Sequence, residues 1–337
     1  MTEHNEQSST IDISVVVPVY NEAPNLVDLV ERIEEALKAM VHSFELILID
    51  DGSQDGSLSL CQVFKSHAPV PVDVIQHQAS KGLAASYNEG IGLVRSPCFL
   101  LIHQDMVLTD RGLLQAFAEG FRQNPELLAQ YPYIFMGRAT WERYSFWQKS
   151  FFSQELGKGY AALVGKCDAY RTEMFRHHLK GFNNRDYRTA GEDTDLLFRI
   201  KKLNLEIKEV AAKVEHLHCL DSGFGIRKLL KKHYQLSEAL GTYFHHLGPF
   251  RIFRLQTLFL LSTIKNIIPL GLLWPDNTVQ YLALGLIILY SLYSNRVLYR
   301  RQFANIRILL LPLVDGMILC GSCFFMFKGW VLGKQQI

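Results

Sequence analysis

The chain has 337 residues, a formal net charge of +2 and a hydrophobic content of 48%. This length fits two structural units rather than one small domain, and the small net charge excludes the broad positive field of a general nucleic-acid binder. Six cysteines without a disulfide framework predict a reducing compartment. The polar residues 1–10 do not have the pattern of a signal peptide and are expected to be disordered.

Strands and helices alternate in the sequence as far as about residue 235. Residues 13–18 predict a buried strand, and the apolar residues after Pro24 recur near every 3.6 positions and predict a helix. Further strands are expected at residues 44–49, 72–76, 98–103 and 207–218, and further helices at residues 83–94, 111–123 and 192–203. The aromatic stretch 131–152 predicts no regular element. This alternation predicts an α/β fold with a mostly parallel sheet, in a domain of residues 11–235.

Carboxylates recur at the ends of the predicted strands and at the start of a later helix. Asp50 and Asp51 end the second strand, Asp105 follows the fourth, and Glu192 and Asp193 begin the helix. Ligands of open α/β sheets bind at the carboxyl ends of strands, where carboxylates suit nucleotide hydroxyls or a metal-bound phosphate. A solvated turn is the alternative for each acid taken alone, because Asp, Gly and Ser are common turn residues. The recurrence in order favours a binding site.

Three segments of the chain resemble a known family. They are Val17-Pro-Val-Tyr-Asn-Glu22, Ile49-Asp-Asp-Gly-Ser-Gln-Asp55 and Lys81-Gly-Leu-Ala-Ala-Ser-Tyr-Asn-Glu-Gly90. They resemble the donor-binding half of family 2 glycosyltransferases, and Gly191-Glu-Asp-Thr-Asp-Leu196 resembles the acidic catalytic motif of that family. The resemblance implies a GT-A fold, in which a Rossmann-like domain binds a nucleotide sugar. The absence of a glycine-rich dinucleotide motif and of a Walker A sequence agrees with this reading.

The resemblance also implies a site for Mg²⁺ or Mn²⁺. Family members hold the cation with an Asp-x-Asp type motif, and here residues 103–105 read His-Gln-Asp. Asp105 is therefore the expected metal ligand, and the role of the histidine is left open. A divalent cation would stabilise the charge on a departing diphosphate. His218 is the second expected ligand, preferred over His216 because Ser222 follows it at the spacing seen in the family.

A further group of residues is implied to bind the donor, which is expected to be UDP-linked. This group consists of Pro18, Tyr20, Glu22, Asp51, Lys81 and Gln104. Pro18 and Tyr20 would shape the pocket for the base, and Asp51 would accept hydrogen bonds from the base or ribose. Lys81 would approach the diphosphate, although a solvated loop charge is the alternative. Asp50 and Asp55 are expected to cap the turn instead.

The catalytic residues implied by the resemblance are Asp193 and the adjacent Glu192. The aspartate that matches Asp193 deprotonates the acceptor hydroxyl, and in-line displacement then inverts the sugar configuration. The alternative is structural, because acidic residues are favoured at helix N-termini by the helix dipole. Asp195 is expected to cap the helix or to pair with Arg199.

Residues 236–337 are expected to form amphipathic and transmembrane helices. A bilayer core needs about 20 apolar residues, and the candidate spans are residues 254–274, 278–295 and 308–327. The connection from Arg296 to Arg307 carries four arginines and no acid, so it is expected on the cytosolic side with the catalytic domain. This favours three spans. With two spans, the first segment would lie flat on the membrane.

These features predict an integral membrane enzyme with a cytosolic catalytic domain. It would transfer a sugar from a nucleotide sugar to a hydroxyl of a lipid-linked glycan acceptor, for cell-envelope or extracellular polysaccharide synthesis. The first alternative is a polyprenyl-phosphate sugar synthase similar to dolichyl-phosphate mannose synthase, whose phosphate nucleophile needs no general base. The second is a non-catalytic membrane scaffold that binds nucleotides.

Overall fold

The computed structural model shows two compact units that alternate along the chain. The first comprises Met1–Phe135, Gly159–Asn184 and Asp193–Cys219. The second comprises Met136–Lys158, Arg185–Glu192 and Leu220–Ile337. Within these units the structure describes residues 12–21, 23–38, 44–110, 112–188, 190–218, 223–247 and 264–336.

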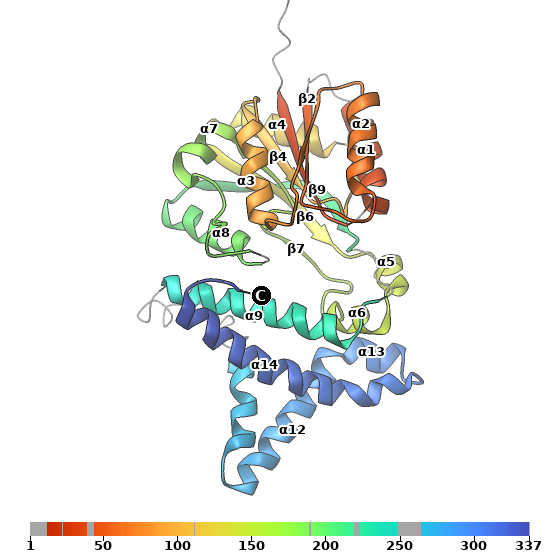
Figure 1. Cartoon of the computed structure of the whole chain (residues 1–337), viewed down its shortest axis with the longest axis vertical. Coiled ribbons are helices and arrows are strands. Elements are labelled where there is room, and N and C mark those ends of the chain that lie inside the picture. The colour runs from red at the N-terminus through yellow and green to blue at the C-terminus, as the bar shows by residue number, and fades with distance from the viewer. Residues whose placement is uncertain are drawn as a thin grey trace, which may run out of the picture. The chain divides into compact units, whose positions relative to one another are not determined.

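A nine-stranded sheet, counted over the described residues, forms the centre of the first unit (Figure 1). Its strand order is β3-β2-β1-β4-β8-β6-β9-β5, and β7 pairs with β6. The first four strands in this order are parallel to one another. They are β1 (Ile13–Val19), β2 (Phe44–Asp50), β3 (Val72–Gln76) and β4 (Cys98–Ile102). β1 and β2 are buried along their whole length, as parallel strands covered on both faces require.

The remaining strands form a mixed half of the sheet. They are β5 (Met106–Leu108), β6 (Leu127–Phe135), β7 (Gly159–Ala161), β8 (Cys167–Arg171) and β9 (Glu206–His216). β8 is antiparallel to β4 and to β6, β5 is antiparallel to β9, and only β6 and β9 pair in parallel here. The expectation of a mostly parallel sheet is therefore wrong beyond β4. β8, which the sequence did not predict, lies between β4 and β6 and is antiparallel to both, so it interrupts the parallel order.

Helices cover both faces of this sheet and create two hydrophobic cores. The first core contains residues of α1 (Ala23–Lys38), α2 (Ser57–His67) and α4 (Leu113–Gln123). The second contains residues of α3 (Leu83–Leu93), α7 (Thr172–Met174), the π-helix η1 (Phe175–Leu179) and α8 (Glu192–Lys202).

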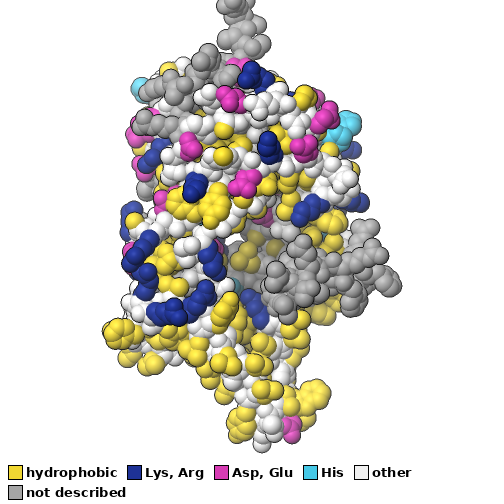
Figure 2. Space-filling view, turned by 180° about the vertical axis from the view of Figure 1, so that it is seen from behind, with side chains coloured by type: hydrophobic (Ala, Val, Ile, Leu, Met, Phe, Trp, Pro, Cys, Tyr) yellow, Lys and Arg dark blue, Asp and Glu magenta, His cyan; other side chains and the backbone are white. Residues whose placement is uncertain are grey.

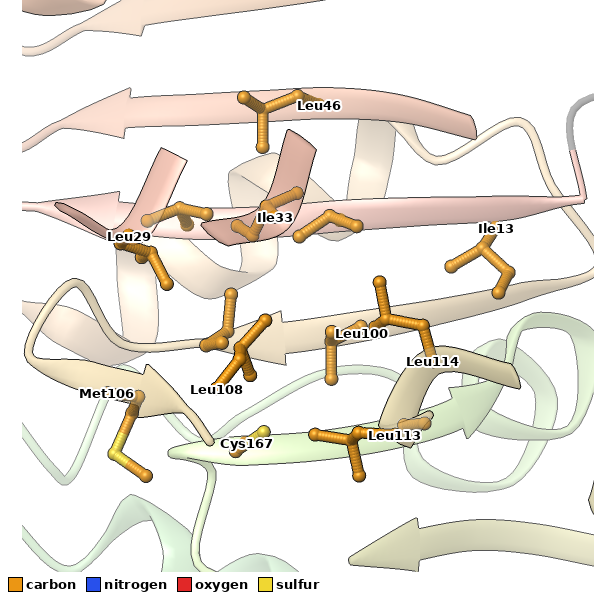
Figure 3. Close-up of a cluster of buried hydrophobic side chains, with 14 of the residues drawn as sticks. Ile13, Leu29, Ile33, Leu46, Leu100, Met106, Leu108, Leu113, Leu114 and Cys167 are labelled. Atoms are coloured by element: carbon orange, nitrogen blue, oxygen red, sulfur yellow. The ribbon is translucent and has the colours of Figure 1, made fainter. Parts of the chain in front are cut away.

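Alternating residues of the central strands divide between these two cores. Val15 and Val17 belong to the first core and Val16 to the second, as the two-residue period of a strand requires. Figure 3 shows the first core, where Leu29 and Ile33 of α1 lie against the strands of the sheet. This packing holds the strand ends, and the loops that follow them, in fixed positions.

The second unit is helical. Its elements are α5 (Arg138–Arg143), α6 (Phe146–Phe151), α9 (Ile226–Leu247), the 3-10 helix η2 (Lys265–Leu273), α12 (Asn277–Ser294), α13 (Arg296–Arg301), the 3-10 helix η3 (Ile306–Leu310) and α14 (Leu311–Leu332). Trp141, Phe146 and Trp147, from the aromatic stretch that predicted no element, are buried with Leu311 and other residues of this unit. The expected domain boundary at residue 235 falls inside α9, and the extent of the catalytic domain stays a prediction.

Helices α9 and α14 lie side by side within the second unit (Figure 1). A Cβ atom at Gly241 would lie 1.9 Å from the carbonyl oxygen of Met326, and one at Gly329 would lie 2.1 Å from that of Glu238. Glycine at both positions therefore allows the two backbones to approach closely. Lys328 lies 2.9 Å from the buried carboxylate of Glu238, which gives that charge a partner.

One helix of the described residues, Ile306–Leu332, is long and apolar enough to cross a membrane. It includes the candidate span 308–327, whereas the candidate span 278–295 corresponds to α12 and the span 254–274 begins outside the described residues. Figure 2 shows hydrophobic side chains gathered over the C-terminal helices. Large exposed side chains there include Leu273, Tyr281, Leu289, Phe303, Leu309 and Phe324. Exposed apolar surface of this kind is typical of membrane or protein contact, and the number of spans stays a prediction.

Candidate functional site

The loops after β1, β2 and β4 meet at the carboxyl edge of the parallel strands, as the strand-end carboxylates predict. The side-chain amide of Gln104 accepts a hydrogen bond from the Tyr20 amide at 3.2 Å and donates one to the Tyr20 carbonyl at 3.3 Å. The Asn21 amide donates to the Ser53 hydroxyl at 3.0 Å, and the Asn21 side chain accepts from the Gln54 amide at 2.7 Å. The three loops therefore form one connected rim.

Two aspartates hold the turn after β2. Oδ2 of Asp50 accepts a hydrogen bond from the Ser53 amide at 3.2 Å. Asp55 accepts from the Ala23 amide at 3.1 Å and from the hydroxyl of Ser57 at 2.6 Å, so it joins the starts of α1 and α2. Their expected turn-capping role is confirmed.

Asp51 ties this turn to the loop formed by residues 79–82. Its carboxylate accepts hydrogen bonds from His77 Nδ1 (2.6 Å), Ser80 Oγ (2.7 Å), the Lys81 amide (2.8 Å) and the Gly82 amide (3.0 Å). Burial alone would raise the pKa of Asp51, but these hydrogen bonds hold the pKa below its ordinary value. A carboxylate has about four acceptor sites, and here the chain itself uses them. The expected contact of Asp51 with the base or ribose stays a prediction.

His77 lies between two carboxylates and was not predicted as a site residue. Its Nδ1 faces Asp51, and its Nε2 lies 2.8 Å from Oε2 of Glu89. The same glutamate lies 3.2 Å from the ammonium group of Lys81, whose side chain is 52% exposed. The structure thus pairs Lys81 with Glu89, and its approach to a donor diphosphate stays a prediction.

The remaining donor-binding candidates lie at the end of β1. Pro18 is buried in the strand, where it pairs with Ile49 of β2. Tyr20 is 50% exposed, and an exposed ring suits stacking on a nucleotide base. Glu22 lies outside the described residues. The donor contacts of all three stay predictions.

Asp105 lies beside two imidazole rings. Its Oδ2 is 3.1 Å from Nε2 of His216, and its Oδ1 is 3.8 Å from Nδ1 of His103. One ligand atom from each residue lies within 4.8 Å of the others. The β5–β9 pairing explains the approach, because His216 lies opposite Met106 and the Leu217 amide donates to the Asp105 carbonyl at 2.9 Å.

His216, and not the preferred His218, belongs to this group of possible metal ligands. Strand β9 ends at His216, and His218 has a φ of 51°, so the regular alternation of the strand does not extend to residue 218. The ring of His218 lies against the ring of His216, with centroids 3.6 Å apart. Ser222 lies outside the described residues, and ligation by His218 stays a prediction.

The charges of this group suit a cation. Burial lowers the pKa of His103 to about 4 and also lowers that of His216. Burial would raise the pKa of Asp105, but the neighbouring histidines hold it below its ordinary value. Neutral imidazole and ionised carboxylate are the forms that bind metals. In addition, the buried Oδ1 of Asp105 has no hydrogen-bond partner among the described residues, and a bound cation would satisfy it.

Lys166 adds a positive charge to the site and was not predicted. Its ammonium group lies 3.5 Å from Nδ1 of His216. Its backbone is fixed by a 2.8 Å hydrogen bond from the His103 amide to the Lys166 carbonyl. No motif in the sequence singles out this lysine, because it precedes β8, which the sequence analysis did not identify.

Asp193 is half-buried in the first turn of α8. Its Oδ1 accepts hydrogen bonds from the amide of Thr194 at 2.6 Å and from the hydroxyl of Thr194 at 3.3 Å. Burial raises the pKa of Asp193, whereas Thr194 and the charge of Lys166 oppose the rise. A carboxylate with a raised pKa is a stronger base, as general-base catalysis needs. The preceding Glu192 is buried.

Arg199 anchors the same helix. Its Nε donates to Oδ2 of Asp195 at 2.8 Å, and its terminal nitrogen donates to the carbonyls of Leu179 and Gly181 at 2.6 and 2.9 Å. The expected pairing of Asp195 with Arg199 is confirmed. Asp195 therefore supports the helix that carries Asp193.

Asp168 is a buried acid of β8 that was not predicted as a site residue. Its Oδ2 accepts hydrogen bonds from the amides of Val164, at 2.9 Å, and Gly165. Burial raises the pKa of Asp168 to about 7, and the negative charge of Asp193 adds to the rise. Asp168 is thus in electrostatic range of Asp193.

Residues 14–179 match the model of a family described as "Glycosyl transferase family 2". The match contains the three segments that resemble the donor-binding half of the family, residues 103–105 and Lys166. The chain carries a family 2 glycosyltransferase domain. The match ends before Asp193 and His216, so their placement in the site rests on the geometry described above.

The glycosyltransferase domain is similar to curated proteins whose names contain a polyprenyl phosphate. It is 27% identical over 124 residues to "Dodecaprenyl-phosphate galacturonate synthase" of Rhizobium johnstonii, covering 37% of each chain. It is 25% identical over 170 residues to "Dolichol-phosphate mannosyltransferase" of Pyrococcus furiosus, covering 50% of this chain and 45% of the relative. It is 32% identical over 94 residues to "Undecaprenyl-phosphate 4-deoxy-4-formamido-L-arabinose transferase" of Pseudomonas fluorescens, covering 28% of each. The matched regions span less than half the length of these relatives.

A solved structure confirms the predicted fold of this chain. It is "Mannosyltransferase PcManGT from Pyrobaculum calidifontis in complex with GDP-Man and Mn2+". The TM-score is 0.55, and the match covers 94% of this chain and 87% of that chain at 12% sequence identity. At this identity the likeness shows the fold alone, which is the predicted GT-A fold.

Proposed function

We propose that this protein transfers a sugar from a nucleotide-sugar donor to a lipid-linked acceptor at a membrane. The observation that carries the proposal is the position of Asp105 between His103 and His216 in a family 2 domain. This group lies next to the rim that Tyr20 and Gln104 form at the carboxyl edge of the sheet. A nucleotide diphosphate and its cation are bound at such an edge in open α/β folds.

The residues around Asp105 fit a divalent cation, for which Mg²⁺ and Mn²⁺ are the candidates. A cation bound there would act as a Lewis acid and stabilise the negative charge of the departing diphosphate. Asp105, His103 and His216 would hold it. The Lys166 ammonium cannot ligate a cation, and we assign it to an anionic oxygen of the diphosphate. The Mn²⁺ named with the structurally similar mannosyltransferase supports this part of the proposal.

The donor would lie along the rim formed by the three loops. The exposed ring of Tyr20 offers a stacking surface for the base, and the Gln104 side chain fixes the Tyr20 backbone from both sides. Asp51 holds residues 79–82, which present backbone amides near the same edge. We propose a UDP-linked donor, with Pro18 and Glu22 completing the pocket for the base.

Asp193 would act as the general base toward an acceptor hydroxyl. Its raised pKa favours proton uptake, and Lys166 supplies a nearby positive charge that opposes the rise. A single displacement by the activated hydroxyl on the face opposite the leaving diphosphate inverts the anomeric configuration. The function is thus an inverting transfer, with Glu192 shaping the start of the same helix.

A polyprenyl phosphate is the second candidate acceptor, and the names of the curated relatives favour it. Its phosphate oxygen is already anionic, so the reaction needs no general base. Asp193 would then orient the acceptor or the donor sugar instead. Both candidate reactions use the same donor site and a lipid-bound acceptor. They differ in how strongly replacement of Asp193 should lower the rate of transfer.

The second unit supports attachment to a membrane. Helix Ile306–Leu332 is apolar over its length, and large hydrophobic side chains are exposed on α12 and α14. Helix α9 carries four basic residues between positions 227 and 232. Their positive charges suit anionic lipid headgroups or the phosphates of the acceptor. We propose an integral membrane protein whose catalytic domain is cytosolic.

A panel of radiolabelled nucleotide sugars tests this function. Membranes from cells that overproduce the protein, and from cells without it, are incubated with each donor and polyprenol-linked acceptors. One donor should give label that extracts into organic solvent, and chelation of divalent cations should remove it. If no donor labels lipid and no donor binds the purified protein, the proposal fails. Donor binding without any transfer or hydrolysis would favour the non-catalytic scaffold.

A further inference from the structure

The group around Asp105 has an unusual donor set for a site that would serve a diphosphate. It offers two imidazole nitrogens, from His103 and His216, and one carboxylate. An Asp-x-Asp motif offers two carboxylates from the same short loop. The substitution of a histidine at residue 103 thus exchanges a charged oxygen ligand for a neutral nitrogen ligand.

Main-chain hydrogen bonds hold the three side chains together. The His103 amide donates to the Lys166 carbonyl at 2.8 Å, and the Met106 amide donates to the His103 carbonyl at 3.1 Å. The Leu217 amide donates to the Asp105 carbonyl at 2.9 Å, directly after His216. The three ligand atoms are therefore brought together by the fold of β4, β5 and β9. A site held in this way is preorganised for a bound ion.

The orientation of His103 is fixed as well. Its ring stacks on Tyr87, with centroids 6.0 Å apart and an angle of 27° between the planes. Its buried Nε2 and the buried Oδ1 of Asp105 have no hydrogen-bond partner among the described residues. Buried polar atoms are nearly always paired in proteins, so the unpaired Oδ1 of Asp105, which lies 3.8 Å from Nδ1 of His103, indicates a ligand at this point.

We propose that this site selects imidazole-binding transition-metal ions over Mg²⁺, with affinity rising from Mn²⁺ to Co²⁺. Mg²⁺ requires oxygen ligands in near-octahedral geometry, and a single carboxylate gives it little charge compensation. Imidazole nitrogen is a good ligand for first-row transition metals, whose affinities follow this order in sites of nitrogen and oxygen. His103 is therefore a determinant of metal selectivity. The inference deepens the proposed function, because the same ion would serve the diphosphate.

The test is metal binding to the full-length protein in detergent after removal of metals with a chelator. Calorimetry with Mg²⁺, Mn²⁺ and Co²⁺ alone should show Co²⁺ and Mn²⁺ binding tighter than Mg²⁺ by about tenfold or more. Pulsed electron paramagnetic resonance of the Mn²⁺ form should show coupling to imidazole nitrogen. Equal affinities for Mg²⁺ and Co²⁺, or a Mn²⁺ spectrum without nitrogen coupling, would overturn the proposal.

The variant His103→Asp provides the matched exchange of one ligand. It should lower the ratio of Co²⁺ affinity to Mg²⁺ affinity by about tenfold or more, whereas His177→Asp, at an exposed position of η1, should leave the ratio unchanged. An unchanged ratio in a folded His103→Asp protein would contradict the assignment. If that variant does not fold, the presence or absence of nitrogen coupling in the Mn²⁺ spectrum of the unmodified protein tests the assignment. Metal selectivity without sugar transfer to any acceptor would instead contradict the proposed function alone.

Discussion

Nδ1 of His77 donates a 2.6 Å hydrogen bond to Oδ1 of Asp51 in the interior of the first unit. Asp51 in turn accepts hydrogen bonds from the backbone amides of Lys81 and Gly82. The position of the 79–82 loop therefore depends on a histidine at the end of β3. The chain uses a buried carboxylate to position backbone amides at the edge of the sheet where the donor is expected.

His77→Ala should lower stability and weaken donor binding together. Removal of the imidazole leaves Asp51 buried with one donor fewer, which costs about 1–3 kcal/mol. Chemical unfolding measures the stability, and calorimetry with a nucleoside diphosphate measures donor binding. Glu89→Gln is the control, because the Glu89 side chain is partly exposed and its loss of charge should cost less than about 1 kcal/mol. Equal losses in both variants would show that the Asp51 contact is unimportant.

Asp168→Asn should change how stability depends on pH. The pKa of Asp168 in the folded protein is about 7, above its ordinary value of 3.8. Between these pH values the folded state binds more protons than the unfolded state, so the contribution of Asp168 to stability falls as pH rises. The asparagine variant does not lose this stability as the pH rises, and its side-chain oxygen can still accept hydrogen bonds from the amides of Val164 and Gly165.

The measurement is the difference in unfolding free energy between Asp168→Asn and the unmodified protein at several pH values. The variant should gain about 2–4 kcal/mol relative to the unmodified protein between pH 5 and pH 8. Titrating groups that do not interact with Asp168 are common to both proteins and cancel in this difference. A difference that does not change with pH would mean that Asp168 has an ordinary pKa in the folded state.

Asp193→Asn should separate the two candidate acceptors. With a hydroxyl acceptor, loss of the general base should reduce transfer by roughly 10²–10⁴-fold, while donor affinity changes only a few-fold. With a polyprenyl phosphate acceptor, no general base is lost, so transfer should fall far less than this. Asp195→Asn is the control on the same helix, because it breaks the pair with Arg199 and should affect stability rather than the rate. Loss of donor binding in Asp193→Asn would contradict both assignments.

The arginines between α12 and α14 should lie on the same side of the membrane as the catalytic domain. Lys and Arg in short loops resist translocation. Three spans then require residues 254–274 to cross despite Lys265, a charge that costs about 2.5–3.5 kcal/mol at a helix centre. In the structure, the Lys265 ammonium lies 3.3 Å from the Tyr290 hydroxyl, which gives it a polar partner.

Ala304→Cys, in a protein without its native cysteines, tests this topology. Ala304 is exposed in the loop that carries the arginines. An impermeant thiol reagent should fail to label intact cells and should label opened cells. Labelling of intact cells would show that this loop is outside and that two spans, not three, precede the C-terminus.

The parallel half of the sheet could be predicted from sequence because its signals are local. The predicted strand at residues 72–76 has the observed bounds of β3, and helices α3 and α8 end within one residue of their expected ends. The mixed half could not be predicted, since β8 and β5 are short and gain their stability from partners far away in the sequence. The aromatic stretch 131–152 likewise depends on packing within the second unit.

The same distinction applies to the candidate site. Asp105, Asp51 and Asp193 could be identified because each follows or begins a recognisable element. Lys166 and Asp168 could not, because they are brought to the site by β8 and belong to no motif. The preference for His218 over His216 relied on the spacing to Ser222 that the family shows, whereas the β5–β9 register places His216 beside Asp105.

Transfer of a sugar from a nucleotide donor to a lipid carrier should depend on the site around Asp105. The most direct test reconstitutes the purified protein in liposomes that contain a polyprenol-linked acceptor, adds the radiolabelled donor and Mn²⁺, and counts label in the organic extract. The unmodified protein should produce labelled lipid, and a folded Asp105→Ala variant should remain near background. Equal labelling by both proteins, or no labelled lipid with any donor, would contradict the account.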